Sequence, residues 1–120
     1  EMRRAIGEIL VASNSTARLI SDMTHRSPQK RLRAVEGAGA MGAIEAVDAL
    51  IVRLDDPDAD VRQMTARVLG ELGDPRAIEP LKRAFISDPD MDVVAAIEPA
   101  LRRLTGPPSE DEDSDERAGD

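Results

Sequence analysis

The sequence predicts an all-α fold, a right-handed α-solenoid in which about seven helices form short hairpins. Residues 30–57 and 61–88 align with each other at an offset of 31 residues, and a third copy begins at residue 88. A fixed period of this size is typical of stacked helical units and not of a single globular core. Phe85 is the only aromatic residue among 120, so the core must consist of aliphatic side chains and alanine.

The aligned positions share residue types, as repeated units require. The coinciding pairs are Gly39 with Gly70, Met41 with Leu72, Gly42 with Gly73, Ala46 with Ala77, Val47 with Ile78, Leu50 with Leu81 and Leu54 with Phe85. An ordinary helical bundle is the alternative, but a bundle does not need the same glycines at a fixed offset. Gly39 and Gly70 fall late in the first helix of each pair, where we expect a neighbouring backbone to pack too closely for a side chain.

The first three helices are expected at about residues 2–12, 15–25 and 28–40. Apolar residues recur at a helical spacing in the first of them, and these are Met2, Ile6, Ile9 and Leu10. The serines and the asparagine at 13–15 end this helix and supply N-caps for the next. Pro28 opens the third helix, at a position where its missing N–H costs nothing.

Four further helices are expected, at about residues 43–54, 60–72, 75–86 and 91–104. Asp58 or Asp60, in the acidic turn before the fifth helix, should cap that helix. Gly73 should end the fifth helix, Asp74 should cap the sixth, and Pro75 should be the first residue of the sixth helix. Pro99 falls in the middle of the seventh helix, where it should kink or shorten that helix.

One domain of helical repeats is expected over residues 1–106, followed by a disordered acidic tail at 107–120. The units of the domain are expected at about residues 1–26, 27–57, 58–88 and 89–106. The tail contains seven acidic residues and one arginine, which account for most of the net charge of −8. Because the chain starts at Glu1, we expect a processed product or a piece of a longer protein.

The body of the chain, residues 1–106, is nearly neutral, with a net charge of −2. It lacks the broad basic surface of a protein that binds phosphate backbones. No stretch approaches the roughly 18 apolar residues of a membrane-spanning helix, so we expect no membrane insertion in this segment. Fourteen of the sixteen basic residues are arginine, as a high-GC genome would give, and we expect a cytoplasmic protein of prokaryotic origin.

Residues 61–81 read VRQMTARVLGELGDPRAIEPL and contain the pattern VR…A…LG..GDPRA…L once. This stretch resembles the short HEAT-like repeat first associated with phycobilin lyases. The unit at 30–54 keeps the glycines and apolar positions but lacks the Val-Arg opening, and the third copy has Val94 where the arginine would be. The resemblance covers residues 27–104 and implies a solenoid of HEAT-like hairpins, while it says little about function.

In HEAT repeats an aspartate before the turn and an arginine after it often form a ladder between units. The resemblance assigns this role to Asp56 and Arg62, which are six residues apart. At the other two junctions one partner is replaced, by His25 and by Val94, so only one junction carries the complete pair. We expect these charges to have a structural role that contributes about 0–1 kcal/mol if they are exposed.

The sequence predicts no enzyme site and no cofactor. His25 is the only histidine and cysteine is absent, so a transition-metal site would need carboxylates alone, and we interpret His25 as a helix C-terminal residue. A related HEAT-fold iron hydroxylase uses paired His-Glu motifs, but Arg26 follows the histidine here, which excludes that activity by resemblance. The carboxylates at 55–60 lack the glycine and the bidentate glutamate of a calcium loop, so we interpret them as turn and capping residues.

We predict a non-catalytic protein–protein interaction or scaffold module, a regulatory part of a longer protein that binds another protein or another domain of the same chain. The second helices of such solenoids line the concave face, which commonly binds partners. Ile51 and Val52 are apolar where the next unit has Lys82 and Arg83, so they are candidates for an apolar anchor beside a mixed-charge rim, unless one of them is simply half-buried. The predicted partner-binding residues are Asp48, Ile51, Val52, Glu79, Lys82 and Arg83.

Two other functions stay open at this point. The resemblance allows an accessory subunit of a lyase-type enzyme, and a basic segment at 25–33 allows weak nucleic-acid binding. Its residues are His25, Arg26, Lys30, Arg31 and Arg33. They have no aromatic neighbour on which bases could stack, and a solvated helix start explains them as well, so nucleic acid is disfavoured. The acidic tail either keeps the protein soluble or folds back on the basic surface at 26–33.

Overall fold

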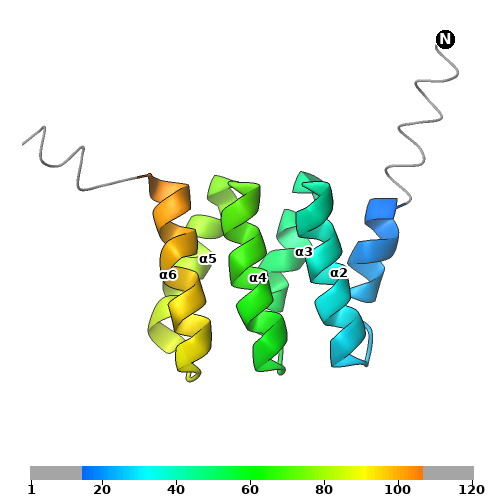
Figure 1. The fold of residues 1–120 in the computed structure, drawn as a ribbon, viewed down its shortest axis with the longest axis horizontal. Coiled ribbons are helices and arrows are strands. Elements are labelled where there is room, and N and C mark those ends of the chain that lie inside the picture. The colour runs from blue at the N-terminus through cyan, green and yellow to red at the C-terminus, as the bar shows by residue number, and fades with distance from the viewer. Residues whose placement is uncertain (1–14, 107–120) are drawn as a thin grey trace, which may run out of the picture.

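A computed structural model describes residues 15–106, which form a row of helical hairpins in two layers (Figure 1). The elements are a helical segment at 15–22, α2 (Pro28–Met41), the 3₁₀ turn η1 (Ile44–Ala46), α3 (Val47–Arg53), α4 (Ala59–Leu72), the 3₁₀ turn η2 (Pro75–Ala77), α5 (Ile78–Ser87) and α6 (Met91–Thr105). Helices α2, α4 and α6 stand side by side in one layer, and α3 and α5 lie behind them (Figure 1). The predicted all-α helical repeat is confirmed; the expected helix at 2–12 and the expected tail at 107–120 lie outside the described residues.

Each helix of the first layer begins and ends at a residue suited to that position. The side chain of Ser27 caps α2, and that of Asp58 caps α4 by accepting from the amide of Asp60 at 2.8 Å. Of the two capping residues offered by the sequence, Asp58 is therefore the one used. Gly42 and Gly73 follow α2 and α4 with φ of 62° and 74°, a left-handed conformation that favours glycine and ends a helix.

Three predicted boundaries differ from the structure. The helix expected at 15–25 ends at residue 22, and the second helices at 43–54 and 75–86 each start with a separate 3₁₀ turn. In these turns the amides of Ala46 and Ala77 bond to the carbonyl three residues back, a tighter geometry that often opens a helix. Both alanines are fully buried, so the tight turn also places small side chains where the layers meet.

A further difference concerns Pro99, which neither ends nor shortens α6. The helix runs without interruption from Met91 to Thr105. Proline removes the amide that would bond to the carbonyl of Ala95, but both residues are exposed, so water can satisfy that carbonyl.

Glycines allow the helices of the first layer to approach closely. A Cβ atom built on Gly39 would lie 2.9 Å from Val68, and one built on Gly70 would lie 2.8 Å from both the Cα and Cβ of Ala100. The expected close approach of a neighbouring backbone is confirmed at Gly70, whereas at Gly39 the close neighbour is the side chain of Val68. The buried core between the layers is aliphatic, as Val35, Leu50, Leu69, Leu81 and Ile97 illustrate.

The 31-residue register extends one unit further toward the N-terminus than sequence comparison indicated. Thr16, Leu19 and Met23 occupy the positions of Val47, Leu50 and Leu54 in α3. Thr16 and Met23 are buried at 5% and 1% exposure, like their counterparts. The helical segment at 15–22 is therefore the second helix of a unit that precedes α2.

Candidate partner-binding face

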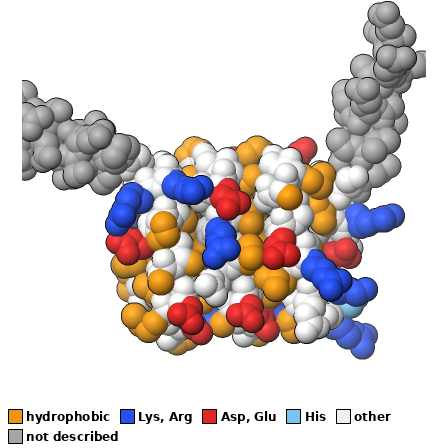
Figure 2. All heavy atoms as spheres, viewed as in Figure 1, with side chains coloured by type: hydrophobic (Ala, Val, Ile, Leu, Met, Phe, Trp, Pro, Cys, Tyr) orange, Lys and Arg blue, Asp and Glu red, His pale blue; other side chains and the backbone are white. Residues whose placement is uncertain are grey.

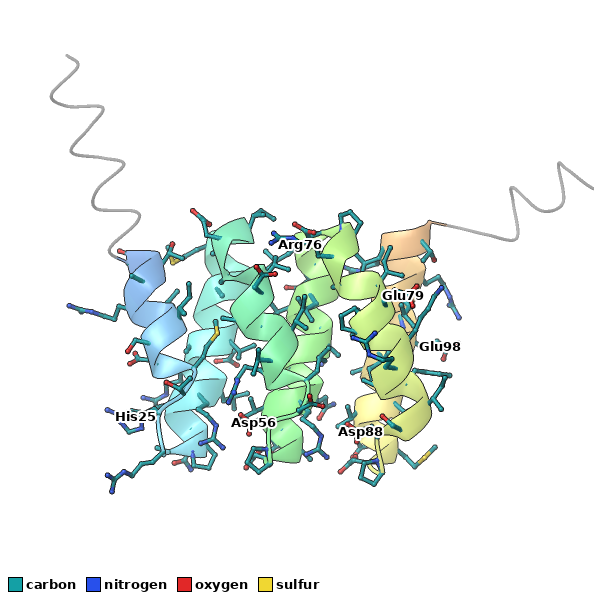
Figure 3. The ribbon with its side chains drawn as sticks, turned by 180° about the vertical axis from the view of Figure 1, so that it is seen from behind. His25, Asp56, Arg76, Glu79, Asp88 and Glu98 are labelled. Atoms are coloured by element: carbon teal, nitrogen blue, oxygen red, sulfur yellow. The ribbon has the colours of Figure 1, made fainter. Side chains whose placement is uncertain are left out.

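The candidate site is the face formed by the second helices, which we call the second-helix face and define as the exposed residues of η1, α3, η2 and α5. These elements lie next to one another on the side of the molecule shown in Figure 3. Val47, Leu50 and Leu81 are fully buried between the layers, so the intervening positions of α3 and α5 remain available to a partner.

An ion pair links the two units across this face. Arg76 Nη1 lies 3.2 Å from Asp48 Oδ1, and Arg76 Nη2 lies 2.9 Å from Asp74 Oδ2 (Figure 3 labels Arg76). The hydrogen bond from Arg76 lowers the pKa of Asp74, and the same bond raises the pKa of Arg76. Because Asp48 is 80% exposed, water screens its attraction to Arg76, and a partner can compete for either group.

Glu79 and Lys82 form a second, looser pair within α5. Their charged atoms lie 3.6 Å apart and both side chains are more than half exposed. Such a pair contributes little to stability, so both charges are free to reorient toward a partner.

The two adjacent apolar residues of this face, Ile51 and Val52, differ in burial. Ile51 is half-buried and packs against the core, whereas Val52 is 56% exposed. Ile51 and Arg83 border a shallow hollow of about 100 Å³ between α3 and α5. The half-buried alternative is thus correct for Ile51, and Val52 is the exposed apolar residue of this face.

The charged ladder between units is present, but its partners differ from the expected ones. Asp56 pairs with Arg31 and not with Arg62: Arg31 Nε lies 2.8 Å from Asp56 Oδ2, and Nη2 lies 2.9 Å from Oδ1. Arg53 and the amide of Asp58 donate two more hydrogen bonds to the same carboxylate. The Asp56 side chain has no exposed area, so the expected value for an exposed pair does not apply.

Arg62 makes the next step of the ladder. Its Nε lies 2.9 Å from Asp88 Oδ2, while its Nη1 donates to the carbonyl of Asp56 at 2.8 Å. Each arginine therefore bonds to two turns. One turn precedes the helix that carries the arginine, and the other follows the next helix and holds the aspartate, 25 or 26 residues further along the chain. A complete arginine–aspartate pair therefore forms in two places, Arg31–Asp56 and Arg62–Asp88, whereas the sequence predicted only one.

His25 takes the place of the ladder aspartate in the first turn. Its Nδ1 accepts a hydrogen bond from the amide of Ser27 at 3.0 Å, as Asp56 Oδ1 accepts from the amide of Asp58 at 2.9 Å. Arg31 donates to the carbonyl of His25 at 2.8 Å. His25 is therefore a turn residue of the ladder, and its role as a helix C-terminal residue was predicted wrongly because the helix ends at residue 22.

The ladder also sets the charge state of its buried carboxylate. Burial raises the pKa of Asp56, but the hydrogen bonds from Arg31 and from the Asp58 amide, with the charges of Arg31 and Arg53, outweigh it and hold this pKa below its ordinary value. Asp56 is thus ionised at neutral pH. Arg31 is buried with it, which removes one of the five residues proposed for nucleic-acid contact.

A larger hollow of about 380 Å³ lies on the opposite face, between α4 and α6, and sequence reasoning missed it. Figure 2 shows this face, over which charged side chains of both signs are scattered. The hollow forms because α6 has smaller or shorter side chains than α4 at equivalent positions. These are Ala95, Ala96, Pro99 and Ala100 in place of Gln63, Met64, Arg67 and Val68. This difference in side-chain size is visible in the sequence and could have predicted the hollow.

Within residues 15–106, no group of three or more histidine, cysteine, aspartate or glutamate residues is arranged to hold a metal ion. No helix in the same range is both long enough and apolar enough to cross a membrane.

Comparison with known families identifies a repeat family. A family model of HEAT repeats matches residues 16–102, which includes the unit that begins before α2. No curated protein matches the chain. The match is to HEAT repeats in general, without a subtype.

Proposed function

The chain belongs to the HEAT-repeat family, and from this premise we propose that it binds a protein partner through the second-helix face. HEAT repeats generally mediate protein–protein interaction or scaffolding, and they are generally non-catalytic. The partner is another protein or another domain of a longer chain, and the module regulates or positions that partner.

The observation that carries the proposed location is the exposure of Val52 among charged residues. An apolar side chain that is 56% exposed gains about 25 cal/mol for each Å² that a partner covers. The same second-helix face carries both signs of charge, on Arg83 and on the exposed pairs Asp48–Arg76 and Glu79–Lys82. An apolar centre with a polar rim is the common anatomy of a protein interface.

The test uses a substitution that the repeat itself supplies. Val52→Arg places at this position the residue type that the next unit carries at Arg83, so the fold should tolerate it. We expect the variant to bind the partner, captured from lysate of the source cell and identified by mass spectrometry, about tenfold more weakly or worse, a loss of about 1.4 kcal/mol.

The matched control is Met41→Arg, which changes an apolar residue of similar exposure, 49%, at the end of α2. This variant should bind as the unmodified chain does. Equal affinity of the Val52→Arg variant and the unmodified chain, with both folded by circular dichroism, would place the interface elsewhere.

A further inference from the structure

The hollow between α4 and α6 is larger than its counterpart one unit earlier. Its volume is about 380 Å³, whereas the matching hollow between α2 and α4 has about 210 Å³. Met64 of α4 borders the smaller hollow, and the residue at the same repeat position in α6 is Ala96. The additional space therefore results from the short side chains of α6.

This hollow is a groove that runs along the two helices, and we call it the α4/α6 groove. Its floor residues follow the three- and four-residue spacing of one side of a helix. They are Ala95, Ala96, Pro99 and Ala100. Asp92 and Arg103 border it 11 positions apart, which is about 16 Å along a helix. A groove of this length with small residues on its floor allows a third helix of about three turns to pack on α4 and α6.

The charged residues at the rim of the groove are available to a partner. They are Arg67 and Glu71 of α4 and Asp92 and Arg103 of α6, and all four are exposed. Within residues 15–106 none of these four side chains forms an ion pair, whereas Arg62 and Arg102 on the same two helices each pair with a carboxylate. A partner would therefore not have to break an existing ion pair to bind them.

The two ends of the groove differ in charge. Asp92 lies in the first turn of α6 and Arg103 in its last turn. By the repeat register, Glu71 is level with Arg103 and Arg67 is one turn before it, so two arginines face one acid toward this end. Acidic side chains also lie along the edge where α4 and α6 begin (Figure 2). A complementary partner has a basic group at the Asp92 end and an acidic group at the arginine end.

An unpaired backbone acceptor lies in the floor of the groove. Pro99 has no amide hydrogen, so the carbonyl of Ala95 lacks the donor that the fourth residue after it normally supplies. Both residues line the groove. A partner that covered this carbonyl without donating to it would leave a buried acceptor unsatisfied, so the partner needs a donor between its two charges.

We propose that the α4/α6 groove binds a helix of a partner protein that carries a basic residue, a serine and an acidic residue on one face. The basic residue pairs with Asp92, the serine donates to the Ala95 carbonyl, and the acidic residue pairs with Arg67 and Arg103. Positions i, i+4 and i+7 lie on one side of a helix and span about 10 Å, which the groove accommodates. This interaction is separate from the second-helix face and does not depend on the proposed function.

The probes are synthetic helical peptides of alanine and glutamine with capped ends, which differ only at positions i, i+4 and i+7. One peptide carries Lys, Ser and Glu there, and two others carry Lys, Ser and Lys or Glu, Ser and Glu. Each is titrated into the ¹⁵N-labelled 120-residue chain and followed by NMR. We expect the Lys-Ser-Glu peptide to shift amides of α4 and α6 saturably, and the other two to bind about tenfold more weakly. No binding at millimolar peptide, or equal affinity for the three, would overturn the proposal.

A substitution supplied by the repeat locates the site. Ala96→Met places in the groove the side chain that α4 carries as Met64, so the fold should tolerate it while the groove is filled. We expect this variant to bind the Lys-Ser-Glu peptide about tenfold more weakly. The matched control is Ala40→Met, at an exposed alanine near the end of α2 and outside the groove, which should bind as the unmodified chain does. Unchanged binding by Ala96→Met would show that the peptide lies elsewhere.

Two further variants check the individual contacts. Asp92→Lys makes both ends of the groove basic, so this variant should prefer the Glu-Ser-Glu peptide to the Lys-Ser-Glu peptide. Pro99→Ala gives the Ala95 carbonyl an amide donor. Replacing the peptide serine with alanine should therefore weaken binding to the unmodified chain but not to Pro99→Ala. An unchanged preference of Asp92→Lys, or an equal effect of the serine in both chains, would contradict the proposed arrangement.

Discussion

Asp56 shows how one side chain holds two repeat units together. Its buried carboxylate accepts two hydrogen bonds from Arg31, one from Arg53 and one from the Asp58 amide, so each of its two oxygens accepts two hydrogen bonds. A buried ion pair of this kind is costly to break, because removing one partner leaves the other charge buried alone. The exposed pair of Asp48 and Arg76 lacks this property.

We expect Asp56→Asn to lower the free energy of unfolding by about 2–4 kcal/mol, since the buried guanidinium of Arg31 loses its counter-charge while the volume stays the same. Asp48→Asn, the matched control at an exposed pair, should cost less than about 1 kcal/mol. Urea denaturation of the three proteins measures both values.

The pH dependence of this difference checks its origin. The pKa of Asp56 is lowered in the folded state, so its ionisation stabilises the fold above the unfolded-state pKa of about 3.9, and this contribution disappears as the pH falls through the folded pKa. The gap between the unmodified protein and the Asp56→Asn variant should therefore be constant near neutral pH and narrow below about pH 4. A gap that persists in acid would mean that packing, and not charge, is responsible.

At the scale of the helix, the spacing between elements is set by glycines with different neighbours. Gly70 faces the backbone of Ala100, which cannot move without shifting α6, whereas Gly37 faces the end of the flexible Leu19 side chain at 3.0 Å. The same added methyl group should therefore have different consequences at the two sites.

We expect Gly70→Ala to destabilise the protein by about 1–3 kcal/mol through overpacking, even though alanine is the better helix former. Gly37→Ala should change stability by less than about 1 kcal/mol, because Leu19 can adjust and the gain in helix propensity offsets the cost. Thermal unfolding followed by circular dichroism compares the two. Equal melting temperatures for both variants would contradict the packing of α4 against α6.

At the scale of the whole molecule, stability should decrease from the centre of the row toward its ends. Helix α4 packs against α2, α3 and α6, whereas the segment at 15–22 and α6 stand at the two ends (Figure 1). In a linear array each unit is stabilised by its neighbours, so a unit with one neighbour opens more easily.

We expect amide hydrogen exchange to be slowest in α4, faster in α6 and fastest in the segment at 15–22. Mass spectrometry of peptic fragments measures this order under native conditions. Uniform protection across the three elements would show that the array unfolds as one cooperative unit.

The sequence by itself determined the helical repeat, its 31-residue register, the capping of the helix at 59–72 by one of two aspartates, Asp58 or Asp60, and the close approach at Gly39 and Gly70. These follow from local preferences and from periodicity, which act within a unit and are visible in one dimension. The ladder illustrates the limit: the family resemblance pointed to Asp56 but paired it with Arg62, six residues further along the chain.

Only the tertiary structure decided which groups meet across units. It paired Asp56 with Arg31, 25 residues away, divided Ile51 from Val52 by burial, and left Phe85 exposed at the end of the row. The physical reason is that neither the burial of a residue nor its ionic partner depends on the residue type alone. Both depend on which helix the stack places beside it and on whether a further unit follows.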